Sequence, residues 1–170
     1  DVLLTHGYFI KEDELEQKIM RPYPPLGLLY VSAYLKKYGM RVTVFDSTFS
    51  EYASLQESIL KHQPKIIAIY ANLMTKVNVI RLMKWVKSQS ELKQSKIVLG
   101  GPDVTFNAEN YLRAGADIIA IGEGEETMLE LSKNITQNIS ITEITGIAFL
   151  KDDAFITNPA RLKVKDMDEF

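Results

Sequence analysis

Residues 97–104, IVLGGPDV, form an apolar run that ends in two glycines. The run is too short and too continuously apolar for an exposed helix, which predicts a buried strand. Paired glycines let a backbone pass close to a bound group where any Cβ would collide, so we expect the turn at Gly100 and Gly101 to face a ligand. The alternative is a tight turn that only joins a core strand to the next helix.

The composition is that of one ordinary globular domain. The chain has 170 residues, 46% of them hydrophobic, and a formal net charge of -2. This length suits a single domain, and the lack of a basic excess argues against nucleic acid or an anionic membrane as a partner. No apolar segment approaches the ~20 residues that cross a bilayer, and no signal-peptide pattern is present, so we expect a cytoplasmic protein. The absence of cysteine excludes disulfides and cysteine-ligated clusters within these residues.

Strand and helix patterns alternate five times along the chain. Apolar runs predict strands at residues 2–4, 42–45, 66–70, 97–99 and 118–121, and helical periodicity predicts helices at residues 28–37, 52–62, 77–88, 107–114 and 125–134. This alternation is typical of a parallel sheet with helices on both faces. We therefore expect an α/β fold, a flavodoxin-like or Rossmann-like doubly wound sheet of five parallel strands in the order 2-1-3-4-5. In the third helix, the residues expected on the buried side are Val77, Ile80, Leu82, Met83 and Val86.

The last part of the sequence changes character. Residues 146–150 and 154–157 are apolar and flank a polar turn at residues 151–153, which predicts a C-terminal β-hairpin extension. From residue 158 onward, charged residues alternate without periodicity. We predict that the domain covers residues 1–158 and that residues 159–170 form a linker.

Each predicted strand is followed by polar residues or glycine. These ends lie at Thr5, Asp46, Tyr70, Gly100 and Gly122. In open parallel sheets, ligands bind at the carboxyl edge, where such ends gather. The long loop that leads to Leu26 and Gly27 contains RPYPP at residues 21–25, which forbids regular helix, and loops of this length usually have a function. We expect a binding cleft along this edge.

The turn GEGEE, residues 122–126, precedes the fifth predicted helix. Acidic residues stabilise a helix start, which favours a structural role for Glu125 and Glu126. Glu123, between two glycines, is the better candidate for a ligand contact. The turn is not a phosphate-binding GxGxxG loop, and its acids would repel a phosphate.

The chain contains two histidines, His6 and His62. His62 lies at a predicted helix end, where a cation interacts favourably with the helix dipole, so we expect it to be structural. His6 lies at the end of the first strand and could be a ligand or an acid–base group. We find no residue spacing typical of a metal site and no catalytic nucleophile. The pattern therefore favours a binding module.

Four short motifs together resemble one family. They are PPLGLLY at residues 24–30, VFD at 44–46, LGGP at 99–102 and IGEGE at 121–125. In this order and at these separations they are similar to the N-terminal cobalamin (B12)-binding domain of radical S-adenosylmethionine enzymes. The group in question contains the anaerobic magnesium-protoporphyrin IX monomethyl ester cyclase and related methylases. The resemblance covers the whole chain.

The resemblance implies cobalamin as the ligand. In the family, a catalytic barrel with a CxxxCxxC motif follows a segment like residues 164–170. We therefore expect the 4Fe-4S cluster, S-adenosylmethionine and a small-molecule substrate to bind an absent C-terminal barrel, which would be the partner of this domain. The full-length protein would be a methyltransferase or an oxidative cyclase, while these residues alone would show no turnover. The alternative is a degenerate flavodoxin-like scaffold or regulatory binding domain that no longer binds cobalamin.

The sequence departs from the family pattern in two places. Cobalamin domains of the methionine synthase type carry DxHxxG, in which the histidine ligates cobalt. Aligned on Gly27, the histidine position is Pro24, so the resemblance implies cobalamin bound without a histidine lower ligand. The usual SxL after the third strand reads Tyr70-Ala71-Asn72 here. A tyrosine in place of the serine would crowd a buried nucleotide tail.

The position of the predicted cleft follows from the strand ends, and its cobalamin ligand follows from the resemblance. The residues expected to border it are Thr5, Gly7, Leu26, Gly27, Asp46, Tyr70, Ala71, Asn72, Gly100, Gly101, Gly122, Glu123 and Gly124.

Overall fold

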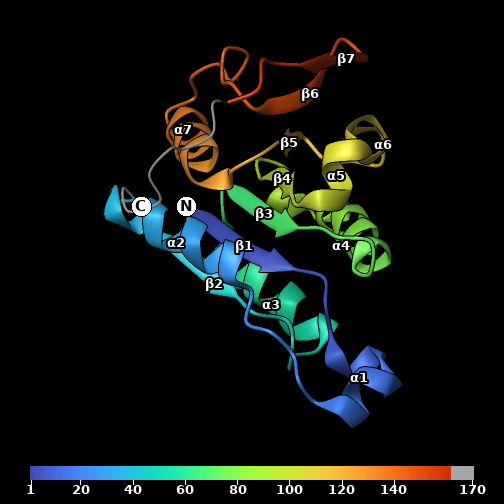
Figure 1. The fold of residues 1–170 in the computed structure, drawn as a ribbon. Coiled ribbons are helices and arrows are strands. Elements are labelled where there is room, and N and C mark those ends of the chain that lie inside the picture. The colour runs from blue at the N-terminus through green and yellow to red at the C-terminus, as the bar shows by residue number, and fades with distance from the viewer. Residues whose placement is uncertain (162–170) are drawn as a thin grey trace.

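The computed structural model describes residues 1–161 and contains a seven-stranded sheet in the order β2-β1-β3-β4-β5-β6-β7. Strands β1 to β5 are parallel, and the hairpin of β6 and β7 joins the edge of β5 in antiparallel fashion (Figure 1). The predicted parallel sheet and its hairpin extension are confirmed. The strand bounds are β1 (Val2–His6), β2 (Val42–Phe45), β3 (Ile66–Tyr70), β4 (Lys96–Gly100), β5 (Ile118–Ala120), β6 (Ile147–Lys151) and β7 (Ala154–Thr157).

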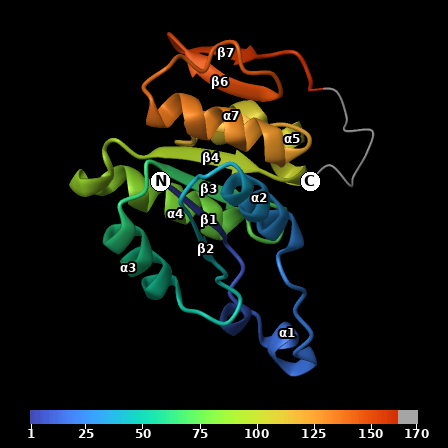
Figure 2. The same ribbon diagram turned by 90° about the vertical axis from the view of Figure 1, so that its left-hand side faces the viewer.

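Helices connect the parallel strands. The β1–β2 and β4–β5 connections each contain two α-helices, and the other connections contain one. Both views place the β6–β7 hairpin at one end of the molecule and α1 at the other (Figures 1 and 2). The helix bounds are α1 (Glu14–Ile19), α2 (Leu26–Lys37), α3 (Tyr52–His62), α4 (Lys76–Ser88), α5 (Pro102–Phe106), α6 (Ala108–Arg113) and α7 (Gly124–Thr136), with 3-10 turns at Ile10–Glu12 and Ser90–Leu92.

The two faces of the sheet carry separate hydrophobic cores. Side chains alternate between the faces of a strand, so in β4 Ile97 and Leu99 enter one core and Val98 enters the other. The first core is closed by α3, α4 and α6, and the second by α2 and α7. Helices α2 and α7 also contact each other. Strands covered on both faces explain why these runs are continuously apolar in the sequence.

Three details differ from the sequence-based expectation. Helix α5 begins at Pro102, directly after the double glycine, where no helix was expected. Helix α2 begins at Leu26, so Gly27 lies within its first turn instead of in an extended loop. The prediction that Val77 faces the core is wrong, because this residue lies on the outer side of the first turn of α4 and is 77% exposed. Val79 is buried in its place.

The segment after β7 folds back onto the domain. The Asn158 amide donates hydrogen bonds to the carbonyl oxygens of Thr142 and Ile144, and the carbonyl of Pro159 accepts one from Gly146. Arg161 then pairs with two carboxylates of α7. The domain boundary at residue 158 stays a prediction, and most of the predicted linker, residues 162–170, lies outside the described residues. Within residues 1–161, no helix has the length and apolar character needed to cross a membrane.

Candidate functional site

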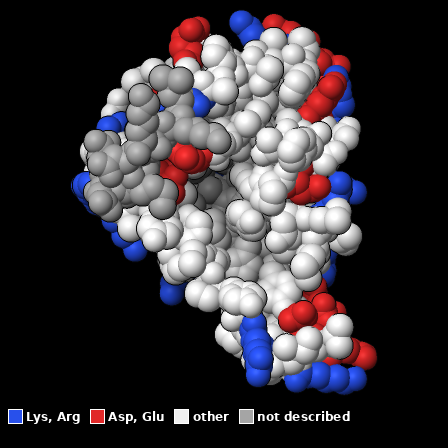
Figure 3. All heavy atoms as spheres, in the orientation of Figure 1, with Lys and Arg blue, Asp and Glu red and all other residues white. Residues whose placement is uncertain are grey.

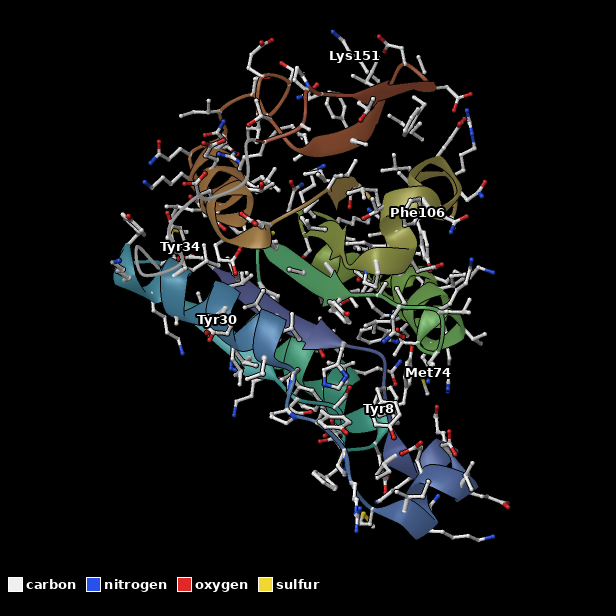
Figure 4. All side chains as sticks on the ribbon, viewed as in Figure 1. Tyr8, Tyr30, Tyr34, Met74, Phe106 and Lys151 are labelled. Carbon is white, nitrogen blue, oxygen red and sulfur yellow. The ribbon has the colours of Figure 1, made fainter. Side chains whose placement is uncertain are left out.

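The parallel strands end side by side at one edge of the sheet. In the strand register, His6 at the end of β1 pairs with Tyr70 at the end of β3, and Tyr70 pairs with Gly100 at the end of β4. The side chains of Tyr8 and Met74 lie on the side to which the arrows of β1 and β3 point (Figure 4). This carboxyl edge brings together residues that are far apart in the sequence.

A cavity of about 510 Å³, which we call the edge cavity, opens at this edge. One of its walls is the loop before α2, residues 21–25, whose prolines keep the chain out of regular helix, together with the first residues of α2. The volume lies within the ~300–1,000 Å³ typical of small-molecule sites. Polar side chains in the lining come from His6, Tyr8, Glu16, Arg21, Tyr23, Thr48, Tyr70, Asn72 and Thr75.

A second cavity of about 260 Å³, which we call the inner slot, lies between α2 and α7 against the sheet. Ala68 and Ala120 form part of its floor together with Val98. Ala68 interrupts a run of isoleucines in β3, and Ala120 follows two isoleucines at the end of β5; the missing side-chain volume leaves room for the slot. Gly27, Leu28 and Tyr70 line both cavities, so the slot adjoins the edge cavity.

The double glycine forms part of the rim of the slot. Gly101 has a φ of 116°, and a Cβ built on it would overlap the carbonyl oxygen of Ala71. The close approach that excludes a side chain at Gly101 is therefore made by the neighbouring strand end. At Gly100 the nearest atom to a built Cβ is the Ala120 oxygen at 4.0 Å, and at Gly27 no atom lies within 4 Å. Gly100 and Gly27 therefore leave space that a ligand can fill.

His6 is held in a buried hydrogen-bond network beside the edge cavity. Its Nδ1 lies 3.2 Å from the backbone nitrogen of Tyr8, which can only donate, so Nδ1 accepts this hydrogen bond. Its Nε2 lies 2.9 Å from Oδ1 of Asp46 and therefore carries the proton in the neutral ring. Ser47 adds a contact of 3.0 Å to Nδ1. Both ring nitrogens are thus engaged within the protein.

The electrostatics of the pair agree with a neutral histidine. Burial lowers the pKa of His6, and the hydrogen bond and charge of Asp46 offset this only in part. Burial raises the pKa of Asp46, but hydrogen bonds from Thr48 and His6 outweigh it and hold the pKa below its ordinary value. The pair is therefore a neutral imidazole that donates to a carboxylate.

The structure brings nine of the thirteen predicted site residues to the two cavities and leaves four outside them. The nine are Leu26, Gly27, Tyr70, Asn72, Gly100, Gly101, Gly122, Glu123 and Gly124. Of the others, Thr5 is buried and donates to the Phe45 carbonyl, and Asp46 holds His6. Gly7 packs closely against Val79 and Asn78 of α4, and Ala71 is fully buried against Gly101. These four residues line neither cavity and belong to the structure around it.

Several lining residues were missed by the sequence reasoning. The edge cavity also uses Tyr8, Glu16 and Thr48, and the slot also uses Val31 and Met128. The length of the loop after β1 was a signal for Tyr8 and Glu16, whereas Thr48 follows β2. The single alanines in the third and fifth strands, Ala68 and Ala120, were a usable signal for the slot.

An exposed apolar rim borders the carboxyl edge. It consists of Leu73, Met74, Val77 and Phe106, which are 71–88% exposed. Figure 3 shows that this face is mostly uncharged and hollowed in its middle, with Lys, Arg, Asp and Glu mainly at its periphery. In the described part of the chain, no group of three or more histidine or acidic side chains could hold a metal ion.

Comparisons with a family model and with curated proteins point to the same group of proteins. A family model described as the B12 binding domain matches residues 17–132. An uncharacterized methyltransferase of Pyrococcus horikoshii is 27% identical over 164 residues, which cover 93% of this chain and 35% of the relative. The anaerobic magnesium-protoporphyrin IX monomethyl ester cyclase of Synechocystis is 27% identical over 151 residues, which cover 86% of this chain and 30% of the relative. The chain thus spans about a third of the length of these curated relatives.

A solved structure shares the fold. The cobalamin-dependent S-adenosylmethionine radical enzyme OxsB with aqua-cobalamin bound superposes with a TM-score of 0.79 at 21% sequence identity. The match covers 95% of this chain and 22% of that enzyme.

Proposed function

Because the chain belongs to the B12-binding domain family, we propose that its edge cavity and inner slot together bind cobalamin. The observation that carries the proposal is the pair of adjoining cavities with a common wall of Gly27, Leu28 and Tyr70. Cobalamin has a wide corrin ring and a narrower nucleotide tail. The ring suits the open edge cavity, and the tail suits the slot.

The residues present fit such a ligand. A corrin carries amide side chains around its ring. The side-chain nitrogen of Asn72 donates no hydrogen bond to any described residue, whereas its Oδ1 accepts one from the backbone nitrogen of Thr75. Most residues that line the slot are apolar or glycine, which suits a flat heteroaromatic base, and its polar side chains are Tyr70, Glu123 and Glu125. Empty space at Gly27 and Gly122, where a built Cβ meets no atom within 4 Å, provides further room.

We propose that no histidine of this domain ligates the cobalt. His6 lines the edge cavity, but both its nitrogens are engaged, by the Tyr8 backbone and by Asp46. The side chain of Pro24, in the wall of the same cavity, has no atom that could ligate the cobalt. Electron paramagnetic resonance of the bound, reduced cobalt(II) form should therefore lack nitrogen superhyperfine splitting from a lower ligand. Splitting that disappears in His6→Gln would overturn this proposal.

The longer protein is proposed to be a radical S-adenosylmethionine enzyme. Its relatives are about three times as long as this chain, which leaves room for a domain that carries a 4Fe-4S cluster and binds S-adenosylmethionine and a small-molecule substrate. The exposed rim of Leu73, Met74, Val77 and Phe106 offers that domain an apolar contact surface next to the edge cavity. When bound, cobalamin supplies methyl-transfer or radical chemistry at its cobalt. The role of this chain is to hold the corrin at the sheet edge and enclose its tail.

The test is a titration of the 170-residue chain with hydroxocobalamin, followed by its visible spectrum and by co-elution in gel filtration. Saturable binding of one cobalamin per chain is expected. The absence of both a spectral change and co-elution at tens of micromolar would contradict the proposal for this domain. Addition of S-adenosylmethionine and a reductant should yield no 5'-deoxyadenosine, because the cluster is expected in the rest of the longer protein.

A further inference from the structure

Tyr8 lies in the wall of the edge cavity, in the loop directly after β1. Its side chain lies on the side of the sheet to which the arrow of β1 points (Figure 4). Burial, and after it the negative charges of Glu16 and Asp13, raise the pKa of the Tyr8 phenol. The phenol therefore lies within reach of the charge of Glu16, which lines the same cavity. Tyr8 is thus part of the surface that a ligand in the edge cavity meets.

Side chains, and not a strand ladder, hold the backbone around Tyr8. The pairing of β1 with β3 ends at His6. Beyond it, the Gly7 carbonyl oxygen accepts a hydrogen bond of 3.1 Å from the Asn78 side chain. The Tyr8 N–H donates one of 3.2 Å to Nδ1 of His6, and the Tyr8 carbonyl oxygen accepts one of 2.9 Å from the Ser47 hydroxyl. Because backbone polar groups are costly to leave without a partner, these contacts set the course of the chain.

His6 is itself fixed and can therefore act as an anchor. Its side chain is only 7% exposed, and its Nε2 donates to Oδ1 of Asp46 over 2.9 Å. With the proton on Nε2, Nδ1 is free to accept from the Tyr8 N–H. The Ser47 hydroxyl lies 3.0 Å from Nδ1 of the same ring. Asp46 and Ser47 directly follow β2, so the turn after β2 determines the position of Tyr8 through the imidazole.

We infer that His6 is a positioning residue of the edge cavity, whose Nδ1 holds the backbone of Tyr8 and thereby places the Tyr8 side chain against the ligand. The imidazole also borders the cavity, but both its nitrogens are engaged within the protein. An effect on the ligand through Tyr8 differs from a direct contact, because it disappears when the Tyr8 side chain is removed. The inference rests on the proposed function, which supplies the corrinoid as the ligand.

Two substitutions of His6 separate its two hydrogen bonds. His6→Asn keeps an acceptor as many bonds from the Cα as Nδ1 is, and loses the donor to Asp46. His6→Gln keeps a donor as many bonds from the Cα as Nε2 is, and loses the acceptor for Tyr8. The Asp46 side chain is 45% exposed, so water can replace the donor that is lost in His6→Asn. His62→Gln is the matched control, because His62 lines neither the edge cavity nor the inner slot.

The dissociation constant of hydroxocobalamin is measured by visible titration of the 170-residue chain and its variants, and urea denaturation without ligand reports their stability. His6→Gln is expected to weaken binding by about two- to tenfold, the range of one neutral hydrogen bond, and His6→Asn should restore most of this loss. Tyr8→Ala should also weaken binding. In a double-mutant cycle, addition of His6→Gln to Tyr8→Ala should weaken it no further. His62→Gln should bind as the original chain does.

Three results would refute the inference while the proposed function stands. They are unchanged affinity in His6→Gln, equal losses in His6→Gln and His6→Asn, and losses from His6→Gln and Tyr8→Ala that add, which would indicate a direct contact of the imidazole with the ligand. If His6→Gln does not fold, Ser47→Ala takes its place, because the Ser47 hydroxyl contacts both Nδ1 and the Tyr8 carbonyl. Its effect on binding must likewise vanish in Tyr8→Ala. If hydroxocobalamin does not bind the unmodified chain, the proposed function itself fails, and the inference fails with it.

Discussion

The backbone of Gly101 passes so close to Ala71 that a Cβ built on the glycine would overlap the Ala71 carbonyl oxygen. The φ of Gly101, 116°, is also a value that residues with a side chain rarely adopt. Gly101→Ala should therefore lower the free energy of unfolding by about 1–3 kcal/mol, measured by urea denaturation.

The neighbouring glycine is a matched control for this prediction. A Cβ on Gly100 would meet no atom closer than 4.0 Å, so Gly100→Ala should change stability far less than Gly101→Ala. Equal losses in the two variants would show that the contact with Ala71 does not set the requirement for glycine.

His6 should make the stability of the domain depend on pH. Its pKa is below the ordinary value of 6.5, chiefly because the side chain is buried. The unfolded chain therefore takes up a proton at a higher pH than the folded chain, and stability is lost as the pH falls from about 6.5 toward the folded pKa. His6→Gln, which is neutral at all these pH values, should flatten the dependence of the urea midpoint between pH 7 and pH 5.

His62→Gln is the control for that experiment. His62 is exposed at the end of α3, and its Nδ1 lies 2.8 Å from the Ser58 carbonyl oxygen of the same helix. The variant should retain the pH dependence of the original chain. An unchanged pH profile in His6→Gln would mean that other groups govern the acid sensitivity.

Arg161 should stabilise α7, the helix that forms one side of the slot. Its guanidinium contacts Glu126 at 2.9 Å and Glu130 at 2.7 Å, its Nε donates to the Thr127 hydroxyl, and its side chain is only 14% exposed. Because the two carboxylates are partly exposed, we expect Arg161→Met to cost about 1–2 kcal/mol in the free energy of unfolding. Arg161→Lys should restore part of the loss, because lysine keeps the charge without the planar fork.

Arg113 provides the comparison for Arg161. It also pairs with two carboxylates, those of Glu109 and Asp153, but its side chain is 46% exposed. Exposed pairs contribute only ~0–1 kcal/mol, so Arg113→Met should have a small effect on urea denaturation. A loss as large as that in Arg161→Met would contradict the view that burial of Arg161 gives its pairs their strength.

The sheet could be predicted from the sequence because the pattern of each element is local. The run IVLG and the double glycine mark the end of β4, and the turn after β5 marks the start of α7, without knowledge of distant contacts. The resemblance to cobalamin-binding domains rests on the same short motifs and is confirmed by the family match. The strand order followed from the right-handed crossover rule.

The details of the site depend on contacts that the sequence does not display. Gly101 was expected to face a ligand and does line the slot, but the close approach that excludes a side chain there comes from Ala71, directly after β3. Val77 fits a helical apolar pattern, yet it is 77% exposed in the first turn of α4, where Val79 is the residue that enters the core. Tyr70 was expected to crowd the tail site, whereas its position beside the slot leaves that cavity open. Each outcome depends on how elements from distant parts of the chain meet.

The central claim is that cobalamin occupies both cavities, and Gly27 allows the most direct test of it. Gly27 lines both, and a Cβ there would meet no atom within 4 Å, so Gly27→Leu adds volume to the binding site from a position where the backbone has room for a side chain. Replacing a helical glycine should also raise the free energy of unfolding by up to ~1 kcal/mol. Ala33→Leu, on the exposed side of α2 and in neither cavity, is the matched control.

The decisive measurement is the dissociation constant of hydroxocobalamin for the three proteins, obtained by visible titration. The account predicts saturable binding to the original chain and to Ala33→Leu, and binding at least about tenfold weaker to Gly27→Leu, a difference of ~1.4 kcal/mol, in a protein that is no less stable. Equal affinity of Gly27→Leu and the original chain would contradict it, because cobalamin would then bind elsewhere.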